Sequence, residues 1–345
     1  MKSQKIIFWT IGFLASAVIA VAIGEVVVRQ FQLSKTWNAK QEEERHRAII
    51  EKYIPDYEKI GYTFLPNVEF ISVREKPYRI NSTGFRDSEF KLKKKQRRVA
   101  FLGDSVIEGF GVEEEDRAAD LAEKQLNESN VNIEFYNFSL GGYSTYDELA
   151  VLKTHVLKHQ PDYAILQVCF NDLEHNFALS RSKQIHAFQN KEKFSGLKSW
   201  LQNRAAFYLF LAEYYNYRKL TNNQANELLD DILNAREELW ELTFQLLEEF
   251  IQTCRNEEIE PVLMYMPYEV EILIENESSG NYATERFAEF CQKQDVKFIE
   301  ATAALRQQKN KSTLYFDHCH FSERGNEAVG EVLANFFKKQ IGEKD

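Results

Sequence analysis

Short apolar runs and longer amphipathic segments alternate along the chain from about residue 97 onward. The apolar runs are rich in β-branched or aromatic residues, and they predict five strands at 98–104, 132–139, 163–172, 261–267 and 296–301. The segments between them carry the periodicity of amphipathic helices. Because strands and helices alternate, we expect an α/β fold of three layers, in which helices cover both faces of a five-stranded parallel sheet.

The amino terminus has a different pattern, an unbroken apolar run from Ile6 to Ile23 with no polar face. A run of this length is about enough to span a bilayer. Lys2 and Lys5 precede it, which favours an amino terminus in the cytoplasm and export of the remaining chain. We therefore expect residues 1–28 to be a transmembrane anchor. A cleaved signal peptide is the alternative, because Ala20-Val21-Ala22 matches a small-residue cleavage site.

Between the anchor and the first predicted strand, residues 29–96 are expected to form a polar stalk followed by an extended lead-in punctuated by Pro and Gly. Residues 97–345 then form the main domain. One piece at about 175–226 interrupts its alternation of strands and helices. Its aromatic residues cover most of a helix circumference, which predicts a helical cap packed on the core; a substrate lid and a membrane-surface helix are the alternatives.

Composition narrows the function classes. The chain has 345 residues, 44% of them hydrophobic, and a formal net charge of -10, which indicates a globular protein. Nucleic acids are bound mainly through Lys and Arg, so this charge argues against a nucleic-acid partner. The basic cluster at 91–98 is local and is expected to be a solvated lead-in to a strand.

The four cysteines are scattered and show no metal-ligand spacing, so no zinc site is expected. Cys254 and Cys291 are the pair to test for a disulfide if the main domain is exported; the alternative is that all four are small buried hydrophobic residues. His155 and His159 are four residues apart on a predicted helix and are expected to be solvated. We expect neither a metal nor a cofactor.

The first predicted strand ends in Gly103-Asp104-Ser105, which puts a serine at the carboxyl edge of a parallel sheet, where such folds place their ligands. A free serine is a weak nucleophile and needs a base with an orienting partner. Asp317 and His320, three residues apart before the last helix, have the spacing for this task, with His320 Nε2 within about 2.6–3.2 Å of Ser105 Oγ. His318 is the rival base, but it adjoins Asp317 and is expected to point elsewhere.

Four blocks in order, FLGDSVIEG, NFSLGGYST, VCFND and DHCH, resemble those of the SGNH hydrolases, also called GDSL-type esterases. The resemblance covers about residues 97–340 and implies the flavodoxin-like fold of that family. The stretch NSTGFRDSEF is similar to the lead-in of its membrane-anchored bacterial members.

This resemblance also implies the roles of individual residues. Ser105 would be the nucleophile, His320 the base and Asp317 its orienting partner. The oxyanion hole would comprise the backbone N–H groups of Ser105 and Gly142 and the side-chain amide of Asn171. Gly141 is the alternative to Gly142 as the glycine that donates its backbone N–H. Cys169 and Phe170 stand where the family often has glycine, which implies a bulkier wall beside Asn171.

These observations predict a membrane-anchored serine esterase that acts outside the cytoplasm. It would remove an acyl group, acetyl included, from a carbohydrate or lipid through an acyl-enzyme. An O-acyltransferase that modifies a cell-surface or exported polysaccharide is the alternative within the same chemistry. A non-catalytic binding or assembly module on a hydrolase fold is the alternative of another class, and it is disfavoured because all four blocks are intact.

Overall fold

The computed structural model of the chain describes residues 2–31, 33–34, 53–54, 62–72, 74–182, 205–211, 232, 234–274 and 277–342. The chain divides into two compact units. We call residues 1–48 and 186–226 the anchor unit, after the anchor predicted within it, and residues 49–185 and 227–345 the catalytic unit, after the catalytic residues predicted there. The polar stalk predicted after residue 34 and most of the cap predicted at 175–226 lie outside the described residues.

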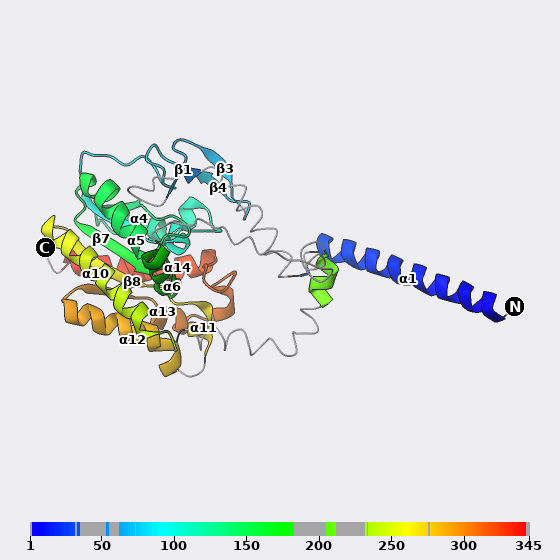
Figure 1. Cartoon of the computed structure of the whole chain (residues 1–345). Coiled ribbons are helices and arrows are strands. Elements are labelled where there is room, and N and C mark those ends of the chain that lie inside the picture. The colour runs from blue at the N-terminus through cyan, green and yellow to red at the C-terminus, as the bar shows by residue number, and fades with distance from the viewer. Residues whose placement is uncertain are drawn as a thin grey trace. The chain divides into compact units, whose positions relative to one another are not determined.

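The catalytic unit is built on the predicted five-stranded parallel sheet, with the strand order β6-β5-β7-β8-β9 (Figure 1). All four strand pairs are parallel. The strands are β5 (Arg97–Leu102), β6 (Ile133–Asn137), β7 (Tyr163–Val168), β8 (Glu260–Tyr265) and β9 (Lys297–Glu300). All six residues of β7, the central strand, are buried, as expected for a parallel sheet covered on both faces.

Helices cover both faces of this sheet. They are α4 (Ala118–Glu128), α5 (Thr145–Val151), α6 (Asn171–Ser182), α10 (Glu237–Asn256), α11 (Glu269–Leu273), α12 (Glu277–Gln294), α13 (Thr302–Gln307) and α14 (Glu323–Gly342). Helix α14 packs on α4, and its Phe337 contacts Tyr163 of β7. Phe287 of α12 stacks instead on Tyr265 of β8. Since the register pairs Tyr163 with Glu260, Tyr163 and Tyr265 face opposite sides, and so do α14 and α12.

Two differences from the predicted element boundaries affect the sheet edge after β7. The third predicted strand ends at Val168 instead of residue 172, and Asn171 is the first residue of α6. Helix α6 continues to Ser182, through the expected start of the insertion at residue 175. At this helix start the N–H groups of Asp172 and Leu173 donate to the carbonyl oxygens of Cys169 and Phe170, so the preceding turn satisfies them.

The lead-in is a folded part of the catalytic unit. It forms two short antiparallel pairs, β1 (Tyr53–Ile54) with β2 (Thr63–Phe64) and β3 (Glu69–Ile71) with β4 (Pro77–Arg79). Phe64, Tyr78 and Phe85 are almost fully buried and belong to the same hydrophobic core as the sheet. We therefore describe residues 62–96 together with the domain that follows.

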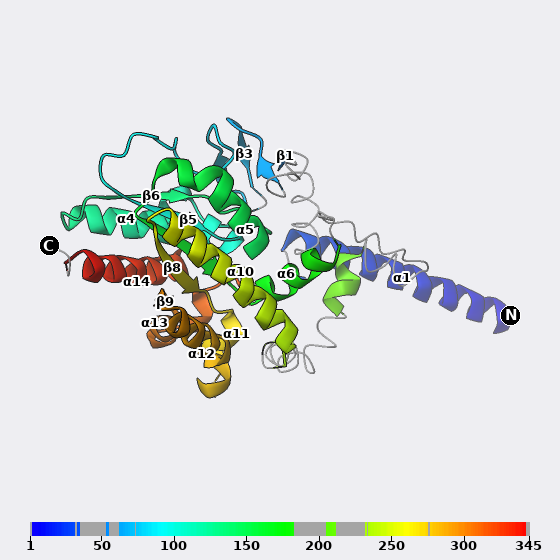
Figure 2. The ribbon, with the colours of Figure 1, turned by 60° about the vertical axis from the view of Figure 1, so that its left-hand side comes forward.

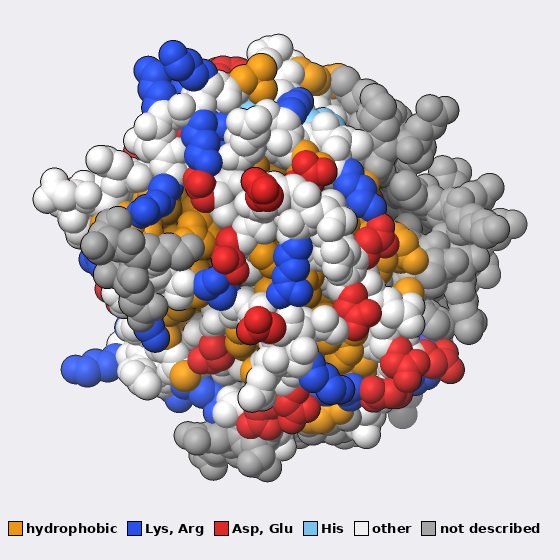
Figure 3. Space-filling model, turned by 90° about the vertical axis from the view of Figure 1, so that its left-hand side faces the viewer, with side chains coloured by type: hydrophobic (Ala, Val, Ile, Leu, Met, Phe, Trp, Pro, Cys, Tyr) orange, Lys and Arg blue, Asp and Glu red, His pale blue; other side chains and the backbone are white. Residues whose placement is uncertain are grey.

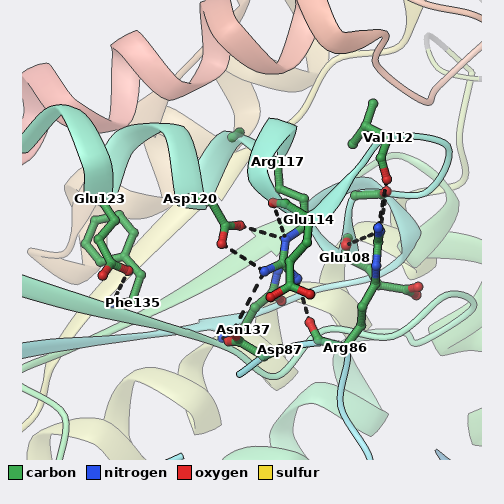
Figure 4. Close-up of polar contacts among 12 residues, drawn as sticks. Arg86, Asp87, Glu108, Val112, Glu114, Arg117, Asp120, Glu123, Phe135 and Asn137 are labelled. Atoms are coloured by element: carbon green, nitrogen blue, oxygen red, sulfur yellow. Dashed lines mark hydrogen bonds and ion pairs between the residues drawn. The ribbon is translucent and has the colours of Figure 1, made fainter. Parts of the chain in front are cut away.

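A buried arginine network ties this lead-in to the segment after β5 (Figure 4). Arg86 donates to the carbonyl oxygens of Gly109 at 2.8 Å and Val112 at 2.7 Å. Arg117 donates to the carbonyl oxygen of Arg86 and to Asp120. A guanidinium buried among carbonyl oxygens uses several of its donors at once, so these contacts fix the loop by geometry as well as by charge.

The cysteines and one histidine also bear on the predictions. Cys254 and Cys291 are both free and buried, so the structure has no disulfide between them. For this pair the alternative holds, in which the cysteines are small buried hydrophobic residues. Burial raises the pKa of each thiol to about 12. The prediction that His159 is solvated is wrong: it is 2% exposed, because Phe90, Tyr136 and Phe138 surround its ring.

The anchor unit contains α1 (Lys2–Gln30), whose segment Trp9–Gln30 is long and apolar enough to cross a membrane. Signal sequences near an amino terminus share these properties.

On the face of the molecule shown in Figure 3, acidic and basic side chains are interspersed and hydrophobic side chains are scattered among them. Such a mixture of charges is common on the surface of a globular domain.

Candidate active site

Ser105 lies at the carboxyl end of β5, where the chain turns directly into the short helix α3 (Ser105–Glu108). Asp104 caps this helix, because its side chain accepts a hydrogen bond from the N–H of Val106 at 2.9 Å. The cap orients the first turn and leaves the Ser105 hydroxyl at the sheet edge. Asp104 is thus a structural residue that caps α3.

His320 and Asp317 come from the loop before α14 and meet Ser105 from the other end of the chain. His320 Nε2 lies 2.8 Å from Ser105 Oγ, and His320 Nδ1 lies 2.7 Å from Asp317 Oδ2. Asp317 Oδ1 also accepts the backbone N–H groups of Cys319 and His320. Burial raises the pKa of Asp317, but these hydrogen bonds outweigh it and hold the pKa well below its usual value. An ionised carboxylate therefore faces the imidazole.

His318 points away from this site. Its ring contacts Tyr268 at 5.6 Å between centroids, and its carbonyl oxygen accepts the N–H of Glu269. Burial lowers the pKa of His318, which favours a neutral ring. The structure therefore brings His320, and not His318, to Ser105.

An aromatic and cationic wall encloses the imidazole of His320. The ring of Phe110 lies 4.6 Å from it, and the ring of Phe316 is nearly parallel to it at 6.0 Å. The guanidinium of Arg74 covers Phe316 at 4.3 Å, and its Nη2 lies 3.6 Å from Asp317 Oδ2. Residue 74 lies between β3 and β4, so the lead-in contributes a charge to the site.

Gly142 and Gly141 follow β6 and differ in what their N–H groups meet. The N–H of Gly141 donates to the buried carboxyl of Glu108. No acceptor for the N–H of Gly142 is found among the described residues, and its φ of 86° is one that glycine adopts without strain. The Tyr62 hydroxyl donates to the carbonyl oxygen of Gly141 at 2.7 Å. Gly142 is therefore better placed than Gly141 to donate to a bound oxyanion.

Asn171 is held by hydrogen bonds on both sides of its amide. Its Nδ2 donates to Asp104 Oδ2 at 3.2 Å, and its Oδ1 accepts the Tyr268 hydroxyl at 3.2 Å. One N–H of the amide group remains for a substrate oxygen, since an amide nitrogen carries two. Asp104 and Tyr268 thereby fix the orientation of a candidate oxyanion donor.

One grouping has the composition of a metal site. Single ligand atoms of Asp317, Cys319 and His320 all lie within 4.8 Å of one another, and the described residues contain no other such group. Asp317 and His320 are already hydrogen-bonded to each other, and His320 also to Ser105. The grouping is thus explained by the Ser-His-Asp arrangement.

Sequence reasoning missed four supporting residues: Tyr62, Arg74, Glu108 and Tyr268. Glu108 lies three residues after Ser105 in the first block, a spacing that places both on one face of a helical turn. Tyr62 and Arg74 carried no such signal, because they lie in a segment read as an extended lead-in. Burial raises the pKa of Glu108, against the opposing effects of Arg86 and of the Gly141 N–H.

Arg74→Met is expected to lower kcat by up to about tenfold, with KM nearly unchanged, because the cation holds Asp317 and covers the aromatic wall. Arg74→Lys should keep most of the activity, since it keeps the charge. Steady-state kinetics of both variants, beside their thermal unfolding midpoints, will check this. A loss of activity that follows a loss of stability, equal in both variants, would contradict a positioning role.

Comparison with known proteins follows this geometry. The family model described as "GDSL-like Lipase/Acylhydrolase family" matches residues 101–328. No curated protein matches the chain. Similar solved structures include the acetyl xylan esterase AlAXEase, with 16% identity, a TM-score of 0.44, and coverage of 69% of this chain and 98% of that one.

Two further solved structures show the same level of similarity. A lipase/acylhydrolase from Enterococcus faecalis has 15% identity and a TM-score of 0.43, and the match covers 71% of this chain and 97% of that one. A variant of an acetylxylan esterase from Geobacillus stearothermophilus has 14% identity and a TM-score of 0.44, with 73% and 97% covered.

Proposed function

This chain belongs to the GDSL-like lipase/acylhydrolase family and is a serine hydrolase that acts on esters; from that premise we propose that it is a membrane-anchored esterase whose catalytic unit lies outside the cytoplasm. Its substrate would be an acyl ester, acetyl included, of a carbohydrate or lipid. The observation that carries the proposal is the hydrogen-bonded series Ser105 Oγ, His320 and Asp317, at 2.8 and 2.7 Å.

In the proposed mechanism, Ser105 Oγ attacks the ester carbonyl carbon while His320 Nε2 accepts the hydroxyl proton. Negative charge develops on the carbonyl oxygen and is stabilised by the N–H groups of Ser105 and Gly142 and by the Asn171 amide. His320 then returns the proton to the leaving alcohol, which gives an acyl-enzyme. Water then attacks the acyl carbonyl carbon while His320 Nε2 accepts its proton, and the imidazolium returns that proton to Ser105 Oγ as the bond to the acyl group breaks and the acid leaves. Asp317 holds the imidazole throughout.

Trapping of the acyl-enzyme tests this proposal. We expect mass spectrometry of the protein quenched during turnover of a p-nitrophenyl acyl ester to find the acyl group on Ser105. Acceptor competition then separates hydrolysis from transfer: release of free acid that is unaffected by added glycans indicates an esterase, and acylated glycan indicates an acyltransferase. An acyl group on another residue, or none, would contradict the mechanism.

Asn171→Ala is expected to lower kcat on the order of 10²–10³-fold, as does the loss of an oxyanion donor elsewhere. Tyr268→Phe should cost much less, because it removes a hydrogen bond to Asn171 Oδ1 but leaves the donating Nδ2 in place. Rates with a short p-nitrophenyl ester at saturating substrate measure both effects. Equal, small losses in the two variants would remove Asn171 from the oxyanion hole.

The anchor is tested by fractionation. The full chain should remain with the membrane, and deletion of residues 1–30 should release it, because α1 carries the apolar segment Trp9–Gln30. A mature protein that starts at Ile23 would instead establish a cleaved signal peptide.

A further inference from the structure

The carboxyl end of α1 differs from the rest of that helix. Apolar side chains along α1, such as Trp9 and Phe13, are more than 70% exposed. Val28 is only 2% exposed, and Gly24 and Glu25 are half-buried. Positions 24, 25 and 28 lie on one face of a helix, within about one turn. One face of α1 is therefore covered at this end.

Residues 205–211, from the aromatic insertion, cover this face. Figures 1 and 2 both show this short green helix beside the carboxyl end of α1. Ala206 and Leu209 form a buried cluster with Val28. The ring of Phe207 lies over Gly24, where an added Cβ would be 2.7 Å from a ring carbon. The contact thus depends on a small residue in α1, as close helix packing in membranes commonly does.

Glu25 adds a polar contact to this packing. Its carboxylate accepts the backbone N–H groups of Ala206 at 3.0 Å and Phe207 at 2.8 Å, and it pairs with Arg29. The first N–H groups of a helix have no partner within the helix, so a carboxylate placed there satisfies them. An acidic residue is costly in an apolar membrane helix, and a fixed set of donors offsets that cost.

The position along α1 indicates what surrounds the docked segment. The run Ile6–Ile23 is about 27 Å long as a helix, close to the thickness of the hydrocarbon core. Gly24 to Arg29 then lie at the outer boundary of the bilayer. Phe207, Tyr208 and Phe210 are partly buried against the cluster, and Leu211 is 47% exposed. Tyr and Trp are enriched at the lipid headgroups, and Tyr208 is a residue of this type.

We propose that residues 205–211 are a second membrane-contacting element, docked on α1 through Gly24, Glu25 and Val28, whose outer side contacts lipid headgroups. The inference rests on the proposed function in that it takes α1 as the membrane span. The insertion joins the catalytic unit at both of its ends. Along the chain, the catalytic unit is therefore connected to the membrane-contacting elements through the insertion as well as through the segment after α1.

Cysteine cross-linking tests the docking in the full chain, reconstituted in vesicles of phosphatidylethanolamine and phosphatidylglycerol. A protease site inserted between residues 190 and 195 separates position 28 from position 209. The pair Val28→Cys/Leu209→Cys should keep the two fragments joined after oxidation and cleavage. The matched pair Val27→Cys/Leu209→Cys should not, because Val27 is 40% exposed and outside the cluster.

Two glycine variants sharpen this test. Gly24→Leu should lower the cross-linking yield several-fold, because its side chain would occupy the place of the Phe207 ring. Gly12→Leu should leave the yield unchanged, since nothing lies within 4 Å of a Cβ at that position. Cross-linking no higher than that of the Val27 pair, in a chain that floats with the vesicles, would overturn the docking.

A lipid-depth measurement tests the headgroup contact. The environment-sensitive fluorophore NBD on Leu211→Cys should be quenched when a phosphatidylcholine with a nitroxide on its headgroup is added to the vesicles. NBD on Leu273→Cys, 43% exposed on α11, should not be quenched, and the unmodified chain gives the background of the native cysteines. Absence of quenching at 211 would overturn the lipid contact.

Flotation and ester turnover, measured on the same vesicles, separate this inference from the proposed function. A wild-type chain that fails to float refutes the anchor in the proposed function and, with it, the lipid contact. A chain that floats but shows no acyl-enzyme refutes the esterase while leaving the docking result valid.

Discussion

Replacement of Ser105 with alanine is expected to lower ester hydrolysis on the order of 10⁴-fold or more, to near the background rate. The hydroxyl supplies the bond-forming electron pair, and no other serine lies at hydrogen-bond distance from His320 in the described part of the chain. The remaining oxyanion donors can stabilise charge but cannot form the acyl-enzyme. Turnover of a short p-nitrophenyl ester, with active-site labelling by a fluorophosphonate, measures the loss.

Ser139→Ala is the matched control for this variant. Ser139 is a buried serine in the block that follows β6, and its hydroxyl has no hydrogen-bond partner among the residues that the structure describes. The control should retain most of the activity, and both variants should unfold at nearly the wild-type temperature. Near wild-type turnover of Ser105→Ala would remove this residue from the mechanism.

The sheet could be predicted from the sequence because its signals are local. Each of the five strands is a short, mainly apolar run, and the burial of β7 on both faces gives a run whose one strongly polar residue is the buried Gln167. The Asp317–His320 pair was also accessible, since three residues within one loop bring the two side chains together without any knowledge of the remaining chain. Their roles in catalysis stay predictions until activity is measured.

The supporting contacts could not be predicted, because they join segments that are distant in sequence. Arg74 meets Asp317 across more than 240 residues, and Tyr62 meets Gly141 across 79. Neither residue stands in a motif, and a charged residue in a segment rich in Pro and Gly is usually solvated. The burial of His159 was missed for the same reason. Its ring contacts Phe90 of the lead-in, and the hydrophobic pattern of the segment that carries His159 does not indicate that contact.

The packing of residues 205–211 shows that an aromatic pattern can predict a helix without identifying the segment on which that helix packs. The aromatic periodicity predicted a helix with an apolar circumference, and a cap on the core was one of three interpretations. In the structure, Ala206 and Leu209 pack on Val28 of α1. The complementary features in α1 are a glycine and a glutamate, Gly24 and Glu25, which hydrophobic periodicity does not register. The cap on the core remains a prediction for the rest of the insertion.

His320→Ala is expected to be about as damaging as Ser105→Ala, because the residues of such an arrangement act as a unit and their losses are not additive. Without the imidazole, nothing accepts the Ser105 proton, and the leaving alcohol receives none. Asp317→Ala should be severe but milder, since the imidazole remains packed on Phe110 and Phe316 but loses the carboxylate that holds its Nδ1.

His318→Ala is the matched control, two residues away in the same loop. It should keep most of the activity, because its ring packs on Tyr268 and does not reach Ser105. The rates of all three variants with one p-nitrophenyl ester, together with their unfolding temperatures, decide the assignment. If His318→Ala were inactive and His320→Ala active at equal stability, the base would be His318, and the hydrogen bond of 2.8 Å between Ser105 and His320 would have no catalytic role.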